Sequence, residues 1–168
     1  MPVLQKIISG GQTGADRAAL RAAREAGPDH GGWCPPGRIA NDGMIPEEFN
    51  LRETPEERSK KAKLIPRSLR TEWNVRDSDG TLVLVPPLPV NDPGMEWTLR
   101  ACRMYRRPVL IIRTGGGDPL PAITAWLKAN RIRTLNVAGP SAASCLTLEN
   151  QAYALLTRVF RKAKSHIP

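Results

Sequence analysis

Apolar positions follow two patterns that take turns along this chain. Short runs rich in aliphatic and β-branched residues recur, and most are followed by a longer segment with apolar residues at helical spacing. The strand-like runs cover residues 4–9, 81–85, 108–112 and 133–137. Strands that alternate with helices are typical of a parallel sheet covered on both faces. We therefore predict an α/β fold with an open, mainly parallel sheet and helices on both faces.

The helical segments are marked by their apolar spacing and by the residues that end them. The first begins after Gly14 and ends at Gly27-Pro28, and its apolar stripe consists of small side chains, which let a helix lie close to a sheet. Its alanines recur at i, i+3, i+4 and i+7: Ala15, Ala18, Ala19, Ala22, Ala23 and Ala26. We predict further helices over residues 95–105, 120–130 and 148–162, and one that carries Arg70.

Residues 31–63 break this alternation. They are rich in glycine, proline and charged residues, with turn signals at Cys34-Pro35-Pro36-Gly37 and Asn41-Asp42-Gly43. A long irregular segment inside a compact domain is more often a functional loop than a linker. Because the chain has no internal repeat and no low-complexity tract, we predict one domain over residues 1–168.

The composition limits the partners that the protein can have. The 168 residues include 25 Lys and Arg against 16 Asp and Glu, a net charge of +9 that favours anionic partners. Cys34, Cys102 and Cys145 are isolated, and with only His30 and His166 to join them they do not form a zinc motif. A leader sequence and an apolar run of membrane length are both absent. We therefore expect a cytoplasmic protein that does not enter a membrane.

The first strand leads directly into a glycine-rich turn and a helix, a combination that favours anion binding. Glycine lets the backbone approach a ligand, and the first turn of a helix offers unpaired N–H groups and the positive end of its dipole. A phosphate is the usual occupant of such a site. The spacing matches neither the dinucleotide fingerprint nor the P-loop, so a purely structural turn is the alternative. The candidate residues are Gly10, Gly11, Gln12, Thr13, Gly14 and Asp16.

The other predicted strands end in small-residue turns as well. In open parallel sheets, ligands bind at the carboxyl ends of the strands, where Gly94-Met95, Gly115-Gly116-Gly117 and Gly139 would meet the first turn. Asp77 and Asp79 precede their strand, so we expect them at the opposite edge, in turns and caps. Arg70 is a candidate for reaching over the ligand, because its planar donors suit phosphate oxygens.

Five blocks of the chain resemble the molybdenum-carrier family, a branch of the SLOG superfamily of Rossmann-like proteins that is related to the phosphoribohydrolases of the LOG, or lysine-decarboxylase-like, group. The blocks appear in the family's order and span essentially the whole chain. They are Ser9-Gly10-Gly11-Gln12-Thr13-Gly14-Ala15-Asp16, Gly31-Gly32-Trp33-Cys34-Pro35 with Gly37-Arg38, Leu51-Arg52-Glu53-Thr54-Pro55, Arg70-Thr71-Glu72-Trp73-Asn74 continuing to Thr81, and Leu135-Asn136-Val137-Ala138-Gly139-Pro140.

The resemblance implies a Rossmann-like homo-oligomer, a dimer or tetramer, that binds molybdenum cofactor, a phosphorylated pterin. Its implied role is storage and transfer of that cofactor to molybdoenzymes, without catalysis and with the cofactor as cargo. To the glycine-rich turn it adds these ligand-binding candidates: Arg38, Arg70, Asn74, Gly94, Met95, Thr98, Gly139 and Ser141. Cys34 is the sole thiol that this loop could offer to molybdenum, although an isolated cysteine is usually a small buried side chain.

The chain departs from the family at the ligand edge. Pro93-Gly94-Met95 stands where the family has Gly-Gly-Thr, and Ser141 follows Gly139-Pro140 where a basic residue is expected. These changes leave the identity of the ligand open between molybdenum cofactor, AMP and ADP-ribose.

An enzymatic alternative is cleavage of nucleotide 5′-monophosphates, as in the phosphoribohydrolases. Those relatives need a glutamate where this chain has Thr98, and a glycosidic cleavage requires a carboxylate at the anomeric carbon. Glu96 could supply it only if the register shifts by two. We therefore favour a non-catalytic binder. A third alternative, a single-stranded nucleic-acid binder, is disfavoured because few aromatic residues are available for base stacking.

Overall fold

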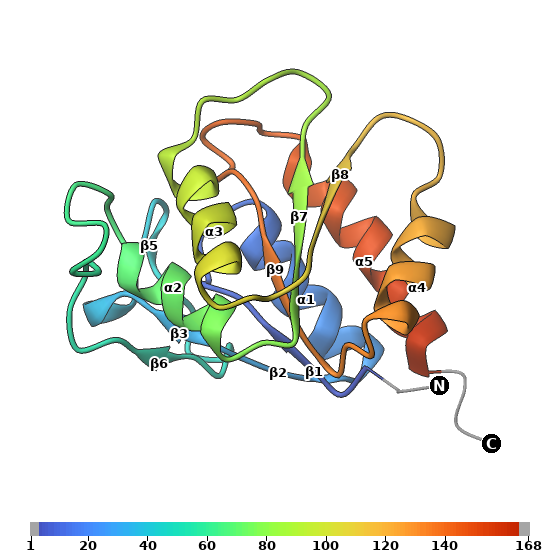
Figure 1. Ribbon diagram of the computed structural model, residues 1–168, viewed down its shortest axis with the longest axis horizontal. Helices are drawn as coiled ribbons and strands as arrows, with labels where there is room; N and C mark the ends of the chain where they lie inside the picture. The colour runs from blue at the N-terminus through green and yellow to red at the C-terminus, as the bar shows by residue number, and fades with distance from the viewer. Residues whose placement is uncertain (1–3, 165–168) are drawn as a thin grey trace.

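The computed structural model describes residues 4–164 and contains a central sheet of five parallel strands (Figure 1). The strand order is β2-β1-β9-β7-β8. The bounds are β1 Lys6–Ile8, β2 Asp29–Gly31, β7 Gly80–Val85, β8 Val109–Arg113 and β9 Thr134–Ala138. The predicted open, parallel α/β sheet is thereby confirmed.

Helices cover both faces of this sheet, as predicted. One face packs against α1 (Ala15–Ala26), α4 (Leu120–Ala129) and α5 (Leu148–Lys164), which share the main hydrophobic core with the strands. The other face packs against α2 (Ser68–Arg76) and α3 (Pro93–Met104), which are joined through Val75, Ala101 and Cys102 (Figure 1). The alanines of α1 are buried, and they let that helix pack closely on α5 and the sheet.

The segment predicted as an irregular loop contains several short elements. They are β3 (Trp33–Cys34), the 3₁₀ helix η1 (Pro36–Arg38), β4 (Ile39–Ala40), β5 (Gly43–Met44) and β6 (Arg52–Glu53). The β3–β6 pair is parallel and β4–β5 is a small hairpin. A small core of Leu20, Cys34, Ala40, Ile45, Phe49 and Leu51 holds this region against α1.

Cys34 is fully buried in that small core, and burial raises the pKa of its thiol. The structure therefore gives it the packing role of an isolated cysteine. His166, which the sequence analysis considered when it excluded a zinc motif, lies outside the described residues. Within residues 4–164, no cluster of three His, Cys, Asp or Glu side chains could hold a metal ion. In the same part of the chain, we find no helix with the length and apolar character needed to cross a membrane.

The aspartates that precede β7 lie at the amino ends of the strands, as predicted. The Oδ2 atom of Asp79 accepts hydrogen bonds from the N–H groups of Arg133 and Thr134, at 3.0 and 2.8 Å, where β9 begins. Asp77 ends α2 and accepts a 2.7 Å hydrogen bond from the Trp33 indole. Both side chains are therefore turn and cap residues.

Candidate functional site

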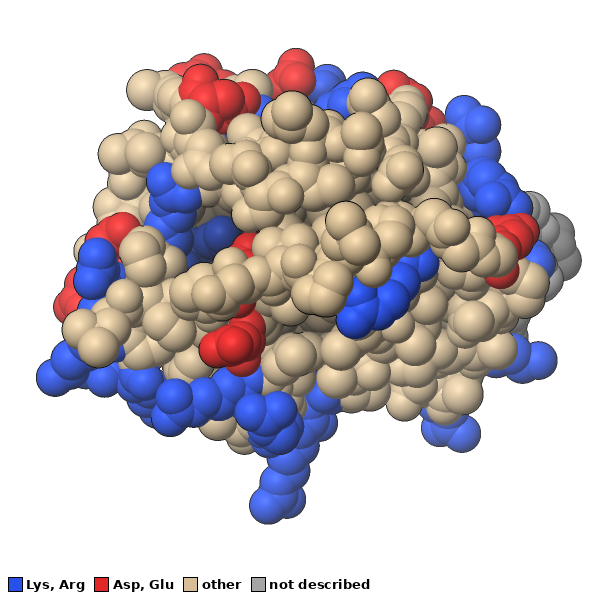
Figure 2. Space-filling view, turned by 90° about the horizontal axis from the view of Figure 1, so that it is seen from above, with Lys and Arg blue, Asp and Glu red and all other residues tan. Residues whose placement is uncertain are grey.

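A cavity of about 320 Å³ opens at the carboxyl ends of the central strands, between the α1 and α3 amino ends and the side of α2. Figure 2 looks down on this edge and shows it hollowed, with basic side-chain atoms deep in the hollow. Ten of the predicted site residues line it: Gly10, Gln12, Asp16, Arg70, Asn74, Gly94, Met95, Thr98, Gly139 and Ser141.

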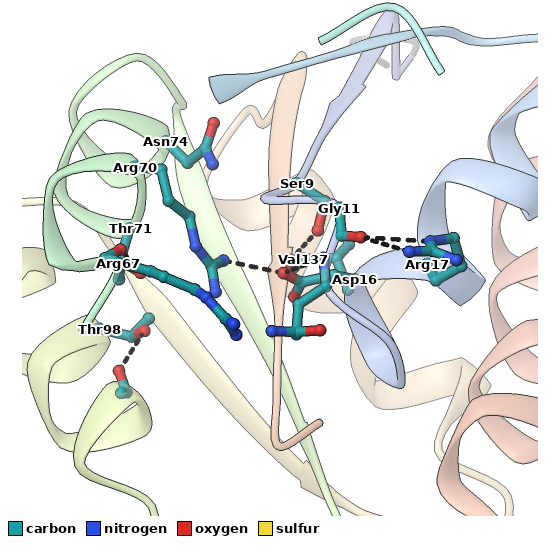
Figure 3. Close-up of polar contacts among 12 residues, drawn as sticks. Ser9, Gly11, Asp16, Arg17, Arg67, Arg70, Thr71, Asn74, Thr98 and Val137 are labelled. Carbon is teal, nitrogen blue, oxygen red and sulfur yellow. Dashed lines mark hydrogen bonds and ion pairs between the residues drawn. The ribbon is translucent and has the colours of Figure 1, made fainter. Parts of the chain in front are cut away.

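The most closely coupled groups in the cavity are Arg70 and Asp16. Nη1 of Arg70 lies 2.9 Å from Oδ2 of Asp16, with 17% of the arginine side chain and 5% of the aspartate side chain exposed. Burial raises the pKa of Asp16, and the charge of Arg70 together with the Gln12, Arg70 and Ser9 hydrogen bonds offsets this only in part. Because the two groups are largely buried and in direct contact, the ion pair holds the guanidinium of Arg70 over the glycine-rich turn (Figure 3).

Gly10 is required by this ion pair. A Cβ atom built on Gly10 would overlap Nη1 of Arg70 and lie 2.6 Å from its Cζ. The glycine thus makes room for an arginine of the same chain. Gly14 is required for a different reason, because it adopts φ 91° and a Cβ there would lie 2.5 Å from the carbonyl oxygen of Pro140.

The N–H groups of the glycine-rich turn are partly satisfied by side chains of the turn itself. The N–H of Gln12 donates to Asp16 at 3.4 Å, and the N–H of Thr13 donates to Oε1 of Gln12 at 2.9 Å. The same Gln12 oxygen accepts from the N–H of Asn41, which ties the β4–β5 hairpin to the turn. Fewer backbone donors therefore remain for an anion than the sequence suggested.

The amino end of α3 is capped in the same way. Oδ1 of Asp92 accepts hydrogen bonds from the N–H groups of Gly94 and Met95, at 2.8 and 3.2 Å. Thr98, one turn later, donates its hydroxyl to the carbonyl of Gly94 at 2.9 Å. These residues line the cavity, but an aspartate already occupies the position that an anion would take at the helix end.

Arg67 is a cavity residue that sequence reasoning missed. It lies at the N-cap position of α2, one turn before Arg70, and its Nη1 donates to Oδ1 of Asn41 at 2.9 Å. Burial lowers the pKa of Arg67 and the nearby charge of Arg70 lowers it further, while the charge of Glu57 acts in the opposite direction without reversing the shift. A recognisable signal was the spacing of Arg67, Arg70, Thr71 and Asn74, which places four polar residues on one helix face.

The two arginines extend from α2 side by side toward the glycine-rich turn (Figure 3). Arg70 is paired with Asp16, whereas Arg67 forms no ion pair with any of the described residues. Nε of Arg70 is buried and has no hydrogen-bond partner within residues 4–164. The cavity therefore contains two adjacent positive charges with donors left over, a favourable arrangement for binding an anion.

Four of the predicted residues lie outside the cavity lining. Gly11, Thr13 and Gly14 belong to the glycine-rich turn but do not line the cavity. The hydroxyl oxygen of Thr13 accepts a hydrogen bond from the N–H of Ala142 at 3.3 Å. Arg38 binds the loop instead. Its guanidinium donates hydrogen bonds to the backbone carbonyls of Ile45, Pro46, Phe49 and Leu51. The structure thus gives Arg38 a scaffolding role and does not bring it to the cavity.

The carboxylates near the site bear on the enzymatic alternative. Glu96 is exposed and does not line the cavity, while Thr98 does. The aspartates in the lining, Asp16 and Asp92, are both bound to groups of the protein. Two asparagines in the lining have structural partners as well: Asn74 bonds the backbone of Trp33, and Asn136 donates to Thr81.

Comparison with known proteins identifies the family. A solved structure named "putative molybdenum carrier protein", from Syntrophus aciditrophicus SB, is 38% identical in sequence, with a TM-score of 0.82 over 95% of this chain and 96% of that one. No curated protein matches the chain. The model of the circularly permuted YpsA SLOG family matches residues 7–160. The resemblance drawn from the sequence is confirmed: this chain belongs to the circularly permuted YpsA family of SLOG proteins.

Proposed function

We propose that the protein binds a phosphorylated small molecule in the cavity and holds it without turnover, with molybdenum cofactor as the cargo. The observation that carries this proposal is the pair of adjacent arginines, Arg67 and Arg70, of which only Arg70 forms an ion pair among the described residues. A phosphate between them would neutralise the two positive charges that repel each other, and its oxygens would accept hydrogen bonds from the unused N–H groups.

Two further observations support binding in this cavity. Its volume of about 320 Å³ lies within the range of small-molecule sites. It is also formed at the carboxyl edge of a parallel sheet, the usual ligand position in such folds. The choice of molybdenum cofactor over other phosphorylated molecules rests on the family resemblance, and the 38% identical solved structure is named a molybdenum carrier.

The absence of turnover is part of the proposal, and the carboxylates support it. Cleavage of an N-glycosidic bond needs a carboxylate free to act at the sugar. Asp16 is engaged by Arg70, Asp92 caps α3, and Glu96 points outside the cavity lining. We accordingly expect the bound molecule to be recovered unchanged.

A thermal-shift panel tests the proposal. The ligands are molybdenum cofactor, its metal-free pterin, molybdate, AMP and ADP-ribose, and a ligand at 100 times its Kd adds roughly 2.7 kcal/mol of stability. We expect stabilisation by the cofactor and by the metal-free pterin, because both carry the phosphate. Arg67→Gln should abolish the shift, whereas Arg133→Gln, a matched loss of one exposed charge outside the cavity, should retain it.

Other outcomes would contradict specific parts of the proposal. Stabilisation by AMP or ADP-ribose alone would replace the cargo with a nucleotide. Stabilisation by molybdate alone would place recognition on the metal and not on the phosphate. Release of free base from AMP, followed by chromatography, would show that the protein is a hydrolase.

A further inference from the structure

A second feature of the molecule has no part in the cavity: the end of α3 and the edge strand β8. From residue 97 to residue 117 the chain contains five arginines and no acidic residue. The exposed residues of this stretch that surround the strand form what we call the basic edge patch: Arg103, Met104, Arg106, Val109, Ile111 and Arg113. None of them lines the cavity.

The arginines of the patch lack the acidic partners that many other arginines of the molecule have. Arg103, Arg106 and Arg113 form no ion pair with any described residue. Elsewhere, seven arginines are paired with carboxylates: Arg17, Arg21, Arg24, Arg58, Arg70, Arg76 and Arg158. The positive charge of the patch is therefore not balanced within the part of the chain that the structure describes.

β8 is an edge strand with open backbone groups. Its only neighbour in the sheet is β7, to which the carbonyl of Pro108 and the N–H of Thr114 are bonded. Backbone groups alternate in direction along a strand, so those of Val109, Ile111 and Arg113 point away from β7. Such an edge can accept another strand.

The exposed face beside this edge is apolar in the middle. Val109 is 37% exposed, Ile111 48% and Met104 38%. Leu110 and Ile112 pack against the main core, so Val109 and Ile111, which alternate with them along β8, lie on the opposite face of the sheet, which α3 covers only in part. Arginines thus flank two exposed aliphatic residues of an open strand.

We propose that the basic edge patch binds an extended acidic segment of a partner protein, which adds a strand to β8. The backbone of the segment would pair with the open edge, its apolar residues would cover Val109 and Ile111, and its carboxylates would meet Arg103 and Arg113. This mode uses the open backbone edge, the exposed aliphatic residues and two of the arginines of the patch. It does not depend on what the cavity binds.

Two other occupants fit the patch less well. A second copy of this chain that paired through the same edge would bring together two patches that both carry arginines and no acidic residue, and such like charges across an interface repel each other. A nucleic acid would satisfy the charge, but the patch offers no aromatic side chain for stacking and leaves its aliphatic residues uncovered.

A defined peptide tests the proposal. The seven-residue sequence Glu-Thr-Val-Thr-Val-Thr-Glu places two valines between two glutamates on one face, and it reads the same in both directions. Fluorescence anisotropy gives its affinity, and ¹H–¹⁵N spectra locate it. We expect saturable binding below about 1 mM, with amide shifts at Val109, Ile111 and Arg113 and weaker binding at higher salt.

Three comparisons separate the contributions of charge, backbone pairing and apolar contact to peptide binding. Replacing Arg103 and Arg113 by Glu should weaken the peptide about tenfold or more, whereas Lys60→Glu with Lys128→Glu, an equal charge change elsewhere, should not. A peptide methylated at alternate backbone nitrogens should lose affinity because it cannot pair with the edge. Ile111→Thr should reduce affinity while it preserves the strand.

The proposal is overturned if the wild-type protein does not bind the peptide, or if N-methylation or the charge reversal leaves its affinity unchanged. It is also overturned if an oligonucleotide of equal charge binds more tightly and loses affinity in the same variants. Cofactor-induced thermal shifts measured on the charge-reversed variant should equal those of the wild type, so that a failure here is distinguishable from a failure of the cavity proposal.

Discussion

At the scale of single residues, the glycine-rich turn serves the protein's own side chains before it serves a ligand. The sequence predicted an anion-binding turn from its glycines and the helix that follows. The structure uses Gly10 to admit Arg70 and uses Gln12 to bond Thr13 and Asn41. The positive charge at the cavity consequently comes from side chains of α2 that the turn makes room for.

Replacement of Gly10 by alanine should therefore damage the site through Arg70. The new methyl group would displace the guanidinium and leave the buried carboxylate of Asp16 without its partner. Loss of a partner by a buried polar group costs about 1–3 kcal/mol. We expect a decrease of that size in the free energy of unfolding in urea, together with loss of ligand-induced stabilisation.

Gly116→Ala is the matched control, because a Cβ at Gly116 would meet nothing within 4 Å. Its free energy of unfolding should stay within about 0.5 kcal/mol of the wild type, as for most surface substitutions. An equally small change in the free energy of unfolding for Gly10→Ala would contradict the claim that Gly10 makes room for the guanidinium of Arg70.

At the scale of elements, the strands and helices of the main sheet were predictable, and the short strand β2 was not. The helix and strand periodicities located β1, β7, β8 and β9 and the helices α1, α3, α4 and α5 to within a few residues, whereas α2 was predicted only as a helix that carries Arg70. β2 consists of Asp29, His30 and Gly31, which have no strand pattern of their own, and it exists because it pairs with β1.

Tertiary contacts also decide where individual basic side chains lie, so the sequence pattern did not place all of them correctly. Arg38 was predicted at the ligand, but four carbonyls of its own loop surround it, a contact that no spacing rule reveals. Arg67 was overlooked because it lies just before α2, although its spacing with Arg70 follows the helix. Residues from regular elements were thus easier to place than residues from the loop.

The end of α2 provides a test of electrostatics. Burial by itself raises the pKa of Asp77, but hydrogen bonds from Arg76 and Trp33 outweigh it and hold the pKa below its ordinary value of 3.8. A lowered folded-state pKa contributes stability above pH 3.8, and this contribution is lost as the pH falls through the folded-state value.

We accordingly expect Asp77→Asn to be less stable than the wild type at neutral pH, and the difference to disappear in acid. Urea unfolding at a series of pH values measures this difference in the free energy of unfolding. Asp29→Asn, which removes an exposed carboxylate without an ion pair among the described residues, should show no such trend. A difference for Asp77→Asn that grew toward low pH would contradict the assignment.

At the scale of the whole molecule, the cavity joins parts of the chain that are far apart in sequence. Gly10 and Asp16 come from the first strand–helix connection, Arg67 and Arg70 from α2, and Gly139 from the end of β9. A ligand that contacts all of them should stabilise the entire fold and not one local segment. This is why thermal unfolding is a suitable readout for binding.

The family resemblance also leads us to expect a homo-oligomer. A single chain has a mass of 18.5 kDa, so a dimer or tetramer is readily distinguished from a monomer by sedimentation equilibrium. We expect a mass two or four times that of the chain, independent of the cavity substitutions. A monomer at all concentrations would contradict this expectation.

The most direct test of the central claim is a crystal structure of the protein with molybdenum cofactor or its metal-free pterin. We predict that the phosphate lies between Arg67 and Arg70, within hydrogen-bond distance of both guanidinium groups and next to Gly10. A ligand bound elsewhere, or one whose phosphate contacts neither arginine, would contradict it.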